Sequence, residues 1–260
     1  MANKNRYPIY IVSKGRYNNP LTANYFKSCK IEFYICVEPQ EYEMYCNSIG
    51  EKHVLKLPFS NLGKGSYPAR NYAWEHAKLN GYAYYWCFDD NIRGFAKWVN
   101  GKRENYKNGI EAIRYVENHV NVSKVDVSGF EYRYFVTKPP KKPFKYNTHV
   151  YSAMLIKTSL EYRWRLKYNE DIDLCLQVLH NGGSTSSCVY YMTNKTSTSV
   201  KMKGGNQDDL YKKNDPIKNL LKAKTIEKAW PQYVKIVIRF GRHHHLIDWK
   251  IFKQKNNARD

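Results

Sequence analysis

Features that mark several common protein classes are missing from this sequence. Its six cysteines include no C-x-x-C pair, and Cys36 and Cys87 lie in apolar, strand-like runs. We therefore expect free thiols in a reducing cytoplasm, and neither a disulfide framework nor a zinc site. The sequence shows no signal peptide and no apolar run of about 18 residues, so we expect a cytoplasmic protein without a membrane-spanning segment.

The Walker A spacing is also missing, although one loop has a similar composition. The loop Gly63-Lys64-Gly65-Ser66 leads into a predicted helix, which Ser66 can cap. Because the required spacing is absent, we exclude a P-loop NTPase. Arg70 falls in the first turn of this helix, where backbone N–H groups favour anions. The alternative for Arg70 is a solvent-exposed helix charge.

Acidic residues are scarce compared with basic ones. The 260 residues include 23 Asp and Glu against 43 Lys and Arg, which gives a formal net charge of +20. This excess indicates a polyanionic partner, nucleic acid first and a membrane surface or acidic glycan second. The 24 tyrosines suit stacking on bases or sugars, although most are expected in the core and on half-buried surface.

The stretch on which the functional prediction depends begins with an uninterrupted apolar and aromatic run, Tyr82 to Phe88. Such a run is typical of a strand covered on both faces in a parallel α/β sheet. Asp89, Asp90 and Asn91 follow at once, which places them at the carboxyl edge of the sheet, where open α/β folds bind ligands. Adjacent carboxylates repel each other unless a cation lies between them, which favours Mg²⁺ or Mn²⁺. The alternative is a polar turn that closes the strand.

Apolar runs alternate with helical patterns along most of the chain, as in an α/β protein. We predict strands at 8–12, 31–37, 53–57, 125–136 and 150–156, and helices near 20–29, 40–49, from 66 onwards and at 107–121. An extended loop is predicted at 138–143, because three prolines prevent regular structure there.

A second group of acidic residues opens a later helix. Apolar residues recur from Ile172 to Leu179 at the spacing of one helix face, and Asn169 can cap this helix. Glu170 and Asp171 therefore fall in its first turn. Acids in that position complement the helix dipole, and a general base at the edge of a cleft would also fit there.

The last part of the chain is strongly basic. From Met192 to Asp260 there are 16 Lys and Arg against 6 Asp and Glu. Alternating apolar residues at 234–240 predict a folded strand in place of a disordered arm. Three successive histidines follow, from His243 to His245. One neutral imidazole among them would complete a metal shell, and the alternative is a basic surface that binds a polyanion.

Taken in order, these motifs resemble those of a GT-A-type glycosyltransferase. More narrowly, the chain resembles the phage TET-associated glycosyltransferases, which modify hydroxymethylated pyrimidines in DNA. The residues that carry the resemblance are Ser13-Lys14-Gly15-Arg16, Val37-Glu38-Pro39-Gln40-Glu41-Tyr42, Lys64-Gly65-Ser66 with Ala69-Arg70-Asn71, Asp89-Asp90-Asn91, and Asn169 to Leu174. They span the chain to about residue 183.

The resemblance implies an α/β, Rossmann-like GT-A fold with a mixed sheet flanked by helices. Residues 1–191 would form the nucleotide-sugar-binding and catalytic core. Residues 192–260 would form a basic C-terminal segment that packs on the core and contributes to acceptor binding. The chain would act as a monomer in the cytoplasm.

The resemblance also implies roles for single residues. The donor would be a UDP-sugar, bound by Ser13, Gly15, Arg16, Glu38, Lys64, Arg70 and Asp89. Mn²⁺ or Mg²⁺ would neutralise the leaving diphosphate, held by Asp90, Asn91, Asp89 and His244. Asp171, or Glu170 in its place, would take the proton from the acceptor hydroxyl. Asn91 departs from the Asp-x-Asp pattern, and an amide oxygen is a weaker ligand than a carboxylate.

The net charge selects DNA as the acceptor, because a transferase of the bacterial envelope would show an amphipathic or transmembrane face. The predicted DNA-binding residues are Lys141, Lys142, Lys201, Lys203 and Arg242. We therefore expect a metal-dependent transfer of glucose or arabinose from UDP to 5-hydroxymethylcytosine in double-stranded phage DNA. One alternative is a glycosyltransferase of the same fold that acts on a glycan or protein. The other is a non-enzymatic basic DNA-binding protein.

Overall fold

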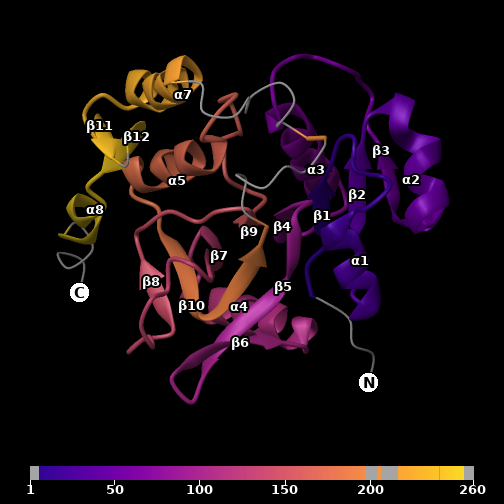
Figure 1. Cartoon of the computed structure of the whole chain (residues 1–260), viewed down its shortest axis with the longest axis horizontal. Coiled ribbons are helices and arrows are strands. Elements are labelled where there is room, and N and C mark those ends of the chain that lie inside the picture. The colour runs from indigo at the N-terminus through magenta and orange to yellow at the C-terminus, as the bar shows by residue number, and fades with distance from the viewer. Residues whose placement is uncertain (1–5, 197–203, 206–215, 240, 255–260) are drawn as a thin grey trace.

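The computed structural model describes residues 6–196, 204–205, 216–239 and 241–254, and shows an α/β fold around a ten-stranded mixed sheet. The strand order is β3-β2-β1-β4-β9-β7-β10-β5-β6, with β8 paired to β10 (Figure 1). The strands are Ile9–Val12 (β1), Tyr34–Val37 (β2), Val54–Lys56 (β3), Tyr84–Asp89 (β4), Ile92–Val99 (β5), Lys102–Tyr106 (β6), Val127–Tyr132 (β7), Phe144–Tyr146 (β8), Ala153–Lys157 (β9) and Thr185–Lys195 (β10). The predicted mixed sheet flanked by helices is confirmed.

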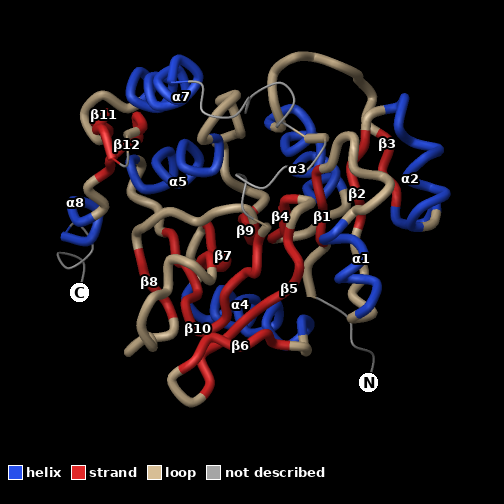
Figure 2. Tube along the Cα trace, in the orientation of Figure 1, coloured by secondary structure: helices blue, strands red, loops and turns tan. Residues whose placement is uncertain are grey.

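Helices cover both faces of the sheet (Figure 2). They are Leu21–Ser28 (α1), Tyr42–Ile49 (α2), Tyr67–Leu79 (α3), Gly109–Ser123 (α4) and Glu170–His180 (α5), with short 3₁₀ turns at Pro39–Glu41 (η1) and Glu51–His53 (η2). Side chains of α1, α2 and α4 share one buried cluster with Trp86 and Phe88 of β4. Side chains of α3 and α5 share a second cluster with Tyr85 and Cys87 of the same strand. Successive β4 residues thus enter opposite cores, as the uninterrupted apolar run predicts.

The N-terminal half of the sheet is parallel, whereas the other half is mixed. Strand β1 lies between β2 and β4 and is parallel to both, with Val12 beside Asp89. The carboxyl ends of β1 and β4 therefore meet at one edge. Strand β9 then pairs antiparallel with β4 and with β7, and β10 pairs parallel with β7. This arrangement brings the end of β10 back towards the end of β4.

The strand predictions for the main sheet missed β5, β6, β8 and β10. Strand β10 carries Thr185, Ser186 and Ser187, which are fully buried although polar. Hydrogen bonds compensate for the burial of two of them: Ser186 Oγ pairs with Ser128 Oγ at 2.8 Å, and Thr185 Oγ1 donates to the Thr148 carbonyl at 2.6 Å. The Ser187 hydroxyl has no such partner among the described residues. A boundary after residue 191 falls inside β10, since Met192 and Thr193 continue its pairing with β5 and β7.

A third layer lies on the outer side of α5. It consists of α7 (Pro216–Ala229), the hairpin β11–β12 (Val234–Arg239 and Arg242–Ile247) and α8 (Lys250–Gln254). Ile172 and Leu176 of α5 pack there against Ile226, Trp230 and Val234. Leu174 and Val178 of the same helix pack in the cluster against the sheet, so the C-terminal layer covers a face of α5 that would otherwise meet solvent.

Two predicted helix caps are also wrong. Asn169 adopts a left-handed conformation with φ 56° and donates from Nδ2 to the Lys222 carbonyl of α7 at 2.9 Å. Ser66 precedes α3, but its hydroxyl donates to Glu170 Oε1 at 2.7 Å and caps no backbone N–H. Both side chains connect elements across the fold in place of capping their own helix. In the described part of the chain, no helix combines the length and apolarity needed to cross a membrane.

Candidate active site

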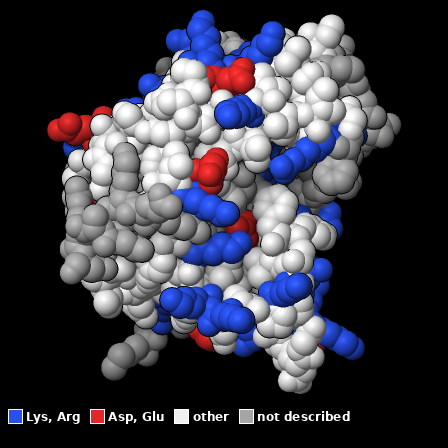
Figure 3. Space-filling model, turned by 90° about the vertical axis from the view of Figure 1, so that its left-hand side faces the viewer, with Lys and Arg blue, Asp and Glu red and all other residues white. Residues whose placement is uncertain are grey.

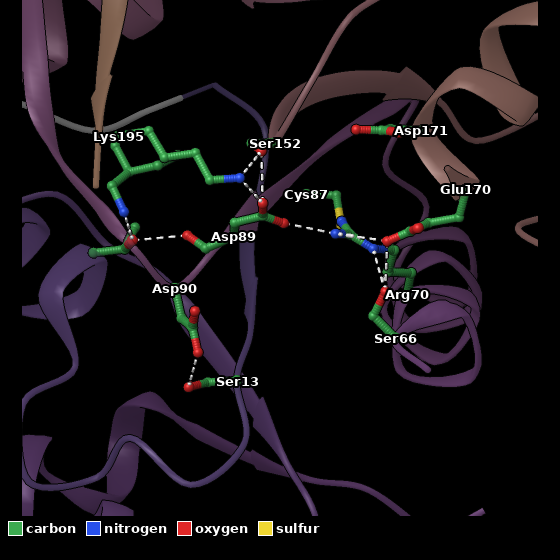
Figure 4. Close-up of polar contacts among 12 residues, drawn as sticks. Ser13, Ser66, Arg70, Cys87, Asp89, Asp90, Ser152, Glu170, Asp171 and Lys195 are labelled. Atoms are coloured by element: carbon green, nitrogen blue, oxygen red, sulfur yellow. Dashed lines mark hydrogen bonds and ion pairs between the residues drawn. The ribbon is translucent and has the colours of Figure 1, made fainter. Parts of the chain in front are cut away.

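The acidic triplet ends β4 at the carboxyl edge of the sheet, as predicted, and its two carboxylates bind different partners (Figure 4). Asp89 is bound by two cations. Its Oδ1 accepts from Arg70 Nη2 at 2.6 Å, and its Oδ2 accepts from Lys195 Nζ at 2.7 Å and from Ser152 Oγ at 2.6 Å. Burial alone would raise the pKa of Asp89, but the charges of Lys195 and Arg70 outweigh it and hold the pKa below its usual range. Asp89 is therefore ionised.

Arg70 connects this carboxylate to the start of α5. The side chain is 5% exposed, which rules out the solvent-exposed alternative. Its Nη2 lies 2.6 Å from Asp89 Oδ1 and 3.4 Å from Glu170 Oε1, and its Nε donates to Ser66 Oγ at 3.2 Å. Although burial opposes the charge, the nearby Cys87, Asp89 and Glu170 raise the pKa of Arg70. The predicted acids of β4 and α5 thus meet through one buried guanidinium.

Asp171 differs from Glu170 in its surroundings. Glu170 binds Ser66 and Arg70, whereas Asp171 Oδ1 accepts only from the backbone N–H of Ile172 at 2.9 Å, among the hydrogen bonds of the described residues. Burial and, second to it, the neighbouring charge of Glu170 raise the pKa of Asp171 to about 7 against the opposing effect of Arg70. A carboxyl group with this pKa is suited to exchanging a proton near neutral pH.

Asp90 lies on the other side of the strand end, against the turn after β1. It forms a buried ion pair with Arg16 and accepts from Ser13 Oγ at 2.6 Å. The Tyr45 hydroxyl hydrogen-bonds Ser13 Oγ at 2.6 Å and accepts from the Arg16 backbone N–H at 3.0 Å. Three of the predicted site residues, Ser13, Arg16 and Asp90, are therefore brought together around Tyr45.

Of the other residues predicted to bind the UDP-sugar, Gly15 and Glu38 lie around the same turn, whereas Lys64 lies in another loop. Gly15 has φ +66° and donates its backbone N–H to Glu41 Oε2 at 2.7 Å. The Glu38 carboxylate pairs with Lys14 Nζ at 2.9 Å. Burial would raise the pKa of Glu38, but its hydrogen bonds, that from Lys14 first, lower the pKa below its usual value. Lys64 is exposed in the loop before α3. Gly204 and Gly205 also reach this turn, since Gly205 N–H donates to the Lys14 carbonyl at 2.7 Å.

Sequence reasoning missed Lys195, Ser152 and Tyr45 as members of the site. Lys195 is the last residue of β10, a strand that the sequence patterns did not reveal. Ser152 has φ 53° and immediately precedes β9. Glu41 was noted only as part of a motif, yet its buried carboxylate fixes the Gly15 turn. Only Lys195 fits the signal of a polar residue at the carboxyl end of a strand, since Ser152 precedes β9 and Tyr45 lies in α2.

The predicted metal ligands do not fit a Mn²⁺ or Mg²⁺ site. Both carboxylates of the triplet are already bound to protein cations and hydroxyls. Asn91 Oδ1 has no hydrogen-bond partner among the described residues, but it is closed to solvent and so does not face an incoming diphosphate. A divalent ion needs several oxygen ligands, and no group of three acidic, His or Cys side chains is arranged for one within the described residues.

His243 and His245 lie on the half-buried face of β12, whereas His244 is exposed. Alternation along the strand produces this difference. Burial, together with the nearby Lys222, His244 and His149, lowers the pKa of His245 to about 4, so its imidazole is neutral. Lys222 lies near Glu170 and Asp171, and burial lowers its pKa to about 8 against the effect of those two acids. The hairpin therefore reaches the α5 end of the site through His245.

The predicted DNA-binding residues lie on one side of the molecule or outside the described residues. Lys141 and Lys142 are exposed in the loop before β8, and Arg242 is exposed at the start of β12. Lys201 and Lys203 lie outside the described residues. Figure 3 views the side on which β8, β12 and α8 lie in Figure 1, and basic side chains there surround a hollow in which acidic atoms are visible.

Comparison with known families places this geometry in context. A model of the TET-associated glycosyltransferase family matches residues 7–205, most of the chain. The chain belongs to this family. The match includes every element of the acidic site, from the turn after β1 to Lys195. The TET-associated glycosyltransferase is thus a transferase, and the predicted resemblance is confirmed.

Other comparisons add little to this assignment. A solved structure described as a nucleotide-diphospho-sugar transferase, from Desulfovibrio desulfuricans G20, is similar over 68% of this chain and 77% of that chain. The two share 11% sequence identity, with a TM-score of 0.36. No curated protein matches the chain. The assignment therefore rests on the family match.

Proposed function

We propose that this TET-associated glycosyltransferase moves a sugar, glucose or arabinose, from a UDP-sugar to 5-hydroxymethylcytosine in double-stranded DNA. The observation that supports this most directly is the half-buried Asp171, with a pKa of about 7, beside the Arg70–Asp89 pair at the carboxyl edge of the sheet. An acceptor hydroxyl and a phosphorylated sugar need such a base and such a cation side by side.

The donor would bind where the turn after β1 meets the end of β4. In this proposal, Ser13, Gly15, Arg16 and Glu38 line the uridine side, and Asp89 contacts the ribose. Arg16 is suited to this role because its Nε has no hydrogen-bond partner among the described residues, although it is buried. Arg70 and the exposed Lys64 would face the diphosphate. These positions follow the β1–β4 edge at which open α/β sheets bind nucleotides.

Asp171 would act as the general base. The carboxylate takes the proton of the hydroxymethyl group, the oxygen forms a bond to the anomeric carbon, and the bond from that carbon to the diphosphate breaks. UDP then leaves with the electron pair. Glu170 is less suited to this step, because Ser66 and Arg70 already occupy its carboxylate.

Aromatic side chains lie beside the proposed base and offer a surface for the acceptor. Tyr132 and Tyr151 stack with ring centroids 5.2 Å apart, and Phe135 lies 5.4 Å from Tyr132. The charge of Asp171 acts on both Tyr132 and Tyr151, so these rings lie near it. Phe135 is 55% exposed and gives a flipped base a face on which to stack.

Removing the exposed Phe135 ring should weaken binding of the DNA acceptor. We expect Phe135→Ala to raise KM for hydroxymethylated DNA about 10-fold, since one base–aromatic stack is worth about 1–3 kcal/mol. KM for the UDP-sugar should stay unchanged. Tyr134→Ala is the matched control, because the Tyr134 ring is 64% exposed but makes no contact with Tyr132 or Tyr151 among the ring pairs of the described residues. Equal KM values for both variants and the parent would remove Phe135 from the acceptor site.

Binding to DNA should fall steeply as salt concentration rises, because each phosphate contact releases counterions. Charge reversal at Lys141 and Lys142 should make the plot of log K for DNA binding against log salt concentration shallower, with a slope smaller in magnitude by about 2. UDP-sugar hydrolysis should stay unchanged. Lys52 and Lys78, which are exposed near the other end of the sheet, provide a charge-matched control pair. A slope that stays constant in the first variant would exclude these lysines from DNA binding.

The function as a whole is tested by incubation with UDP-sugars and DNA that contains cytosine or 5-hydroxymethylcytosine. Mass spectrometry of the digested nucleosides identifies the transferred sugar. UDP release without modified nucleosides would favour a glycan or protein acceptor. The absence of UDP release from every donor, together with retained DNA binding, would favour the non-enzymatic alternative.

A further inference from the structure

Lys195 lies where a glycosyltransferase of this kind was expected to hold its metal ion. The ammonium contacts Asp89 Oδ2 at 2.7 Å and Ser152 Oγ at 2.6 Å (Figure 4). It also lies 3.2 Å from the Tyr132 hydroxyl. On the opposite oxygen of the same carboxylate lies Arg70, at 2.6 Å. Asp89 therefore has a cation on each oxygen, and both cations belong to the protein.

The surroundings of Lys195 keep it charged. The ammonium lies 2.7 Å from the Asp89 carboxylate, and an opposite charge at that distance favours the charged form of the lysine. The Lys195 and Asp89 side chains are 14% and 22% exposed, so the pair is not sealed from an incoming donor. An incoming donor can therefore reach an ammonium group that the protein itself supplies.

The contacts of Lys195 can change without leaving a buried group unpaired. The Tyr132 hydroxyl and Ser152 Oγ hydrogen-bond each other, and Ser152 Oγ also contacts Asp89. If the ammonium turns towards a phosphate, both hydroxyls therefore keep a partner. Its longest contact, 3.2 Å to Tyr132, is the one that such a movement would give up first.

We propose that Lys195, with Arg70, neutralises the diphosphate of the donor, and that sugar transfer by this protein needs no divalent cation. The inference rests on the proposed function, because it concerns the same donor site. As the bond from the anomeric carbon to the diphosphate breaks, negative charge builds up on the leaving UDP. A lysine held in place by Asp89 stabilises that charge as a metal ion would, and it needs no reorganisation at the moment of reaction.

The experiment is calorimetric titration of UDP into the full chain, in EDTA and in Mn²⁺. We expect the same Kd in both solutions. Lys195→Met should weaken UDP binding about 10- to 100-fold in EDTA, the usual effect of losing a hydrogen bond to a charged group. Lys195→Arg keeps the charge and should recover most of the affinity. A purely structural role for Lys195 would lower the unfolding temperature of Lys195→Met along with its affinity for UDP, so thermal unfolding of both variants separates the two roles.

Lys157→Met is the matched control, because Lys157 also ends a strand and pairs with one carboxylate, Asp126, at 3.4 Å. It should bind UDP with the parent affinity. A Kd for UDP that falls tenfold or more when Mn²⁺ is added to the parent would overturn the inference and leave the proposed function intact. Normal UDP binding by a folded Lys195→Met variant would also overturn the inference and leave the proposed function intact. If the parent bound no nucleotide in either solution, the proposed function itself would fail.

Discussion

Replacing Asp171 with asparagine should lower the rate of sugar transfer by about 10²–10⁴, the usual contribution of a positioned general base. Asparagine keeps the size of the side chain and can still accept from the Ile172 N–H, but it cannot take a proton. UDP binding should remain, since the donor contacts lie on Arg70 and Asp89. Unfolding at pH 8 should not become easier, because burial and Glu170 already disfavour the ionised carboxylate there.

The pH profile offers a second measurement of the same assignment. Burial raises the pKa of Asp171 to about 7, so the group is protonated, and inactive as a base, below that pH. We therefore expect kcat/KM to rise with pH and to level off above about 7 in the parent protein. The residual activity of Asp171→Asn should lack this rise. Activity that is already maximal at pH 5 would show that the base is another group.

Glu170→Gln is the matched control for Asp171→Asn. The two acids are adjacent, but Glu170 is bound to Ser66 and Arg70 while Asp171 is not. We expect Glu170→Gln to lower UDP affinity modestly, by loosening Arg70, and to retain the rise of kcat/KM with pH. If only Glu170→Gln lost sugar transfer, the general base would be Glu170. If both variants kept near-normal rates, neither acid would be the base, and the pair would only stabilise the start of α5.

The parallel half of the fold and its acidic edge could be predicted from local patterns. Tyr82 to Phe88 are apolar without interruption because β4 is buried on both faces, and the polar residues come directly after it. Periodicity of this kind depends only on neighbouring residues. It therefore placed Asp89, Asp90, Glu170 and Asp171 on the correct elements without knowledge of the rest of the chain.

Long-range contacts account for what could not be predicted. Lys195 reaches Asp89 across 106 positions of sequence, through a strand whose buried hydroxyls give no apolar signal. The pairing of Asp89 with a protein cation could not be predicted for the same reason, because Lys195 comes from this distant strand. Likewise, Asn169 looks like a helix cap by position, but a carbonyl of α7 takes its side-chain N–H.

Asp173 lies two residues after Asp171, and we expect it to stabilise the fold and to take no part in catalysis. It is fully buried and accepts from Arg165 Nη2 at 2.9 Å, Gln177 Nε2 at 2.9 Å and Trp230 Nε1 at 2.7 Å. Trp230 follows α7, so this one carboxylate connects α5 to the C-terminal layer. The sequence did not distinguish it from the acids beside it, since all three fall in the first turn of the helix.

We expect Asp173→Ala to lower the free energy of unfolding by about 3 kcal/mol. The N–H groups of Trp230 and Gln177 lose their acceptor inside the protein, and each such loss costs about 1–3 kcal/mol. The contribution of Arg165 is discounted, because its side chain is 49% exposed and returns to water. In a chain of this size the change corresponds to a fall in Tm of about 6–12 °C. Thermal and urea unfolding measure it directly.

The comparison with two controls separates structural from functional acids on one helix. Glu161→Ala removes an exposed acid and should change stability by less than about 0.5 kcal/mol, whereas Asp171→Asn should leave Tm unchanged while abolishing most of the transfer. Below its unfolding temperature, Asp173→Ala should still bind UDP, because the partners of Asp173 (Arg165, Gln177 and Trp230) make no contact with the Arg70–Asp89 pair among the hydrogen bonds and ion pairs of the described residues. A Tm equal to that of the parent would mean that Trp230 and Gln177 find other acceptors, and that the C-terminal layer is held by apolar packing alone.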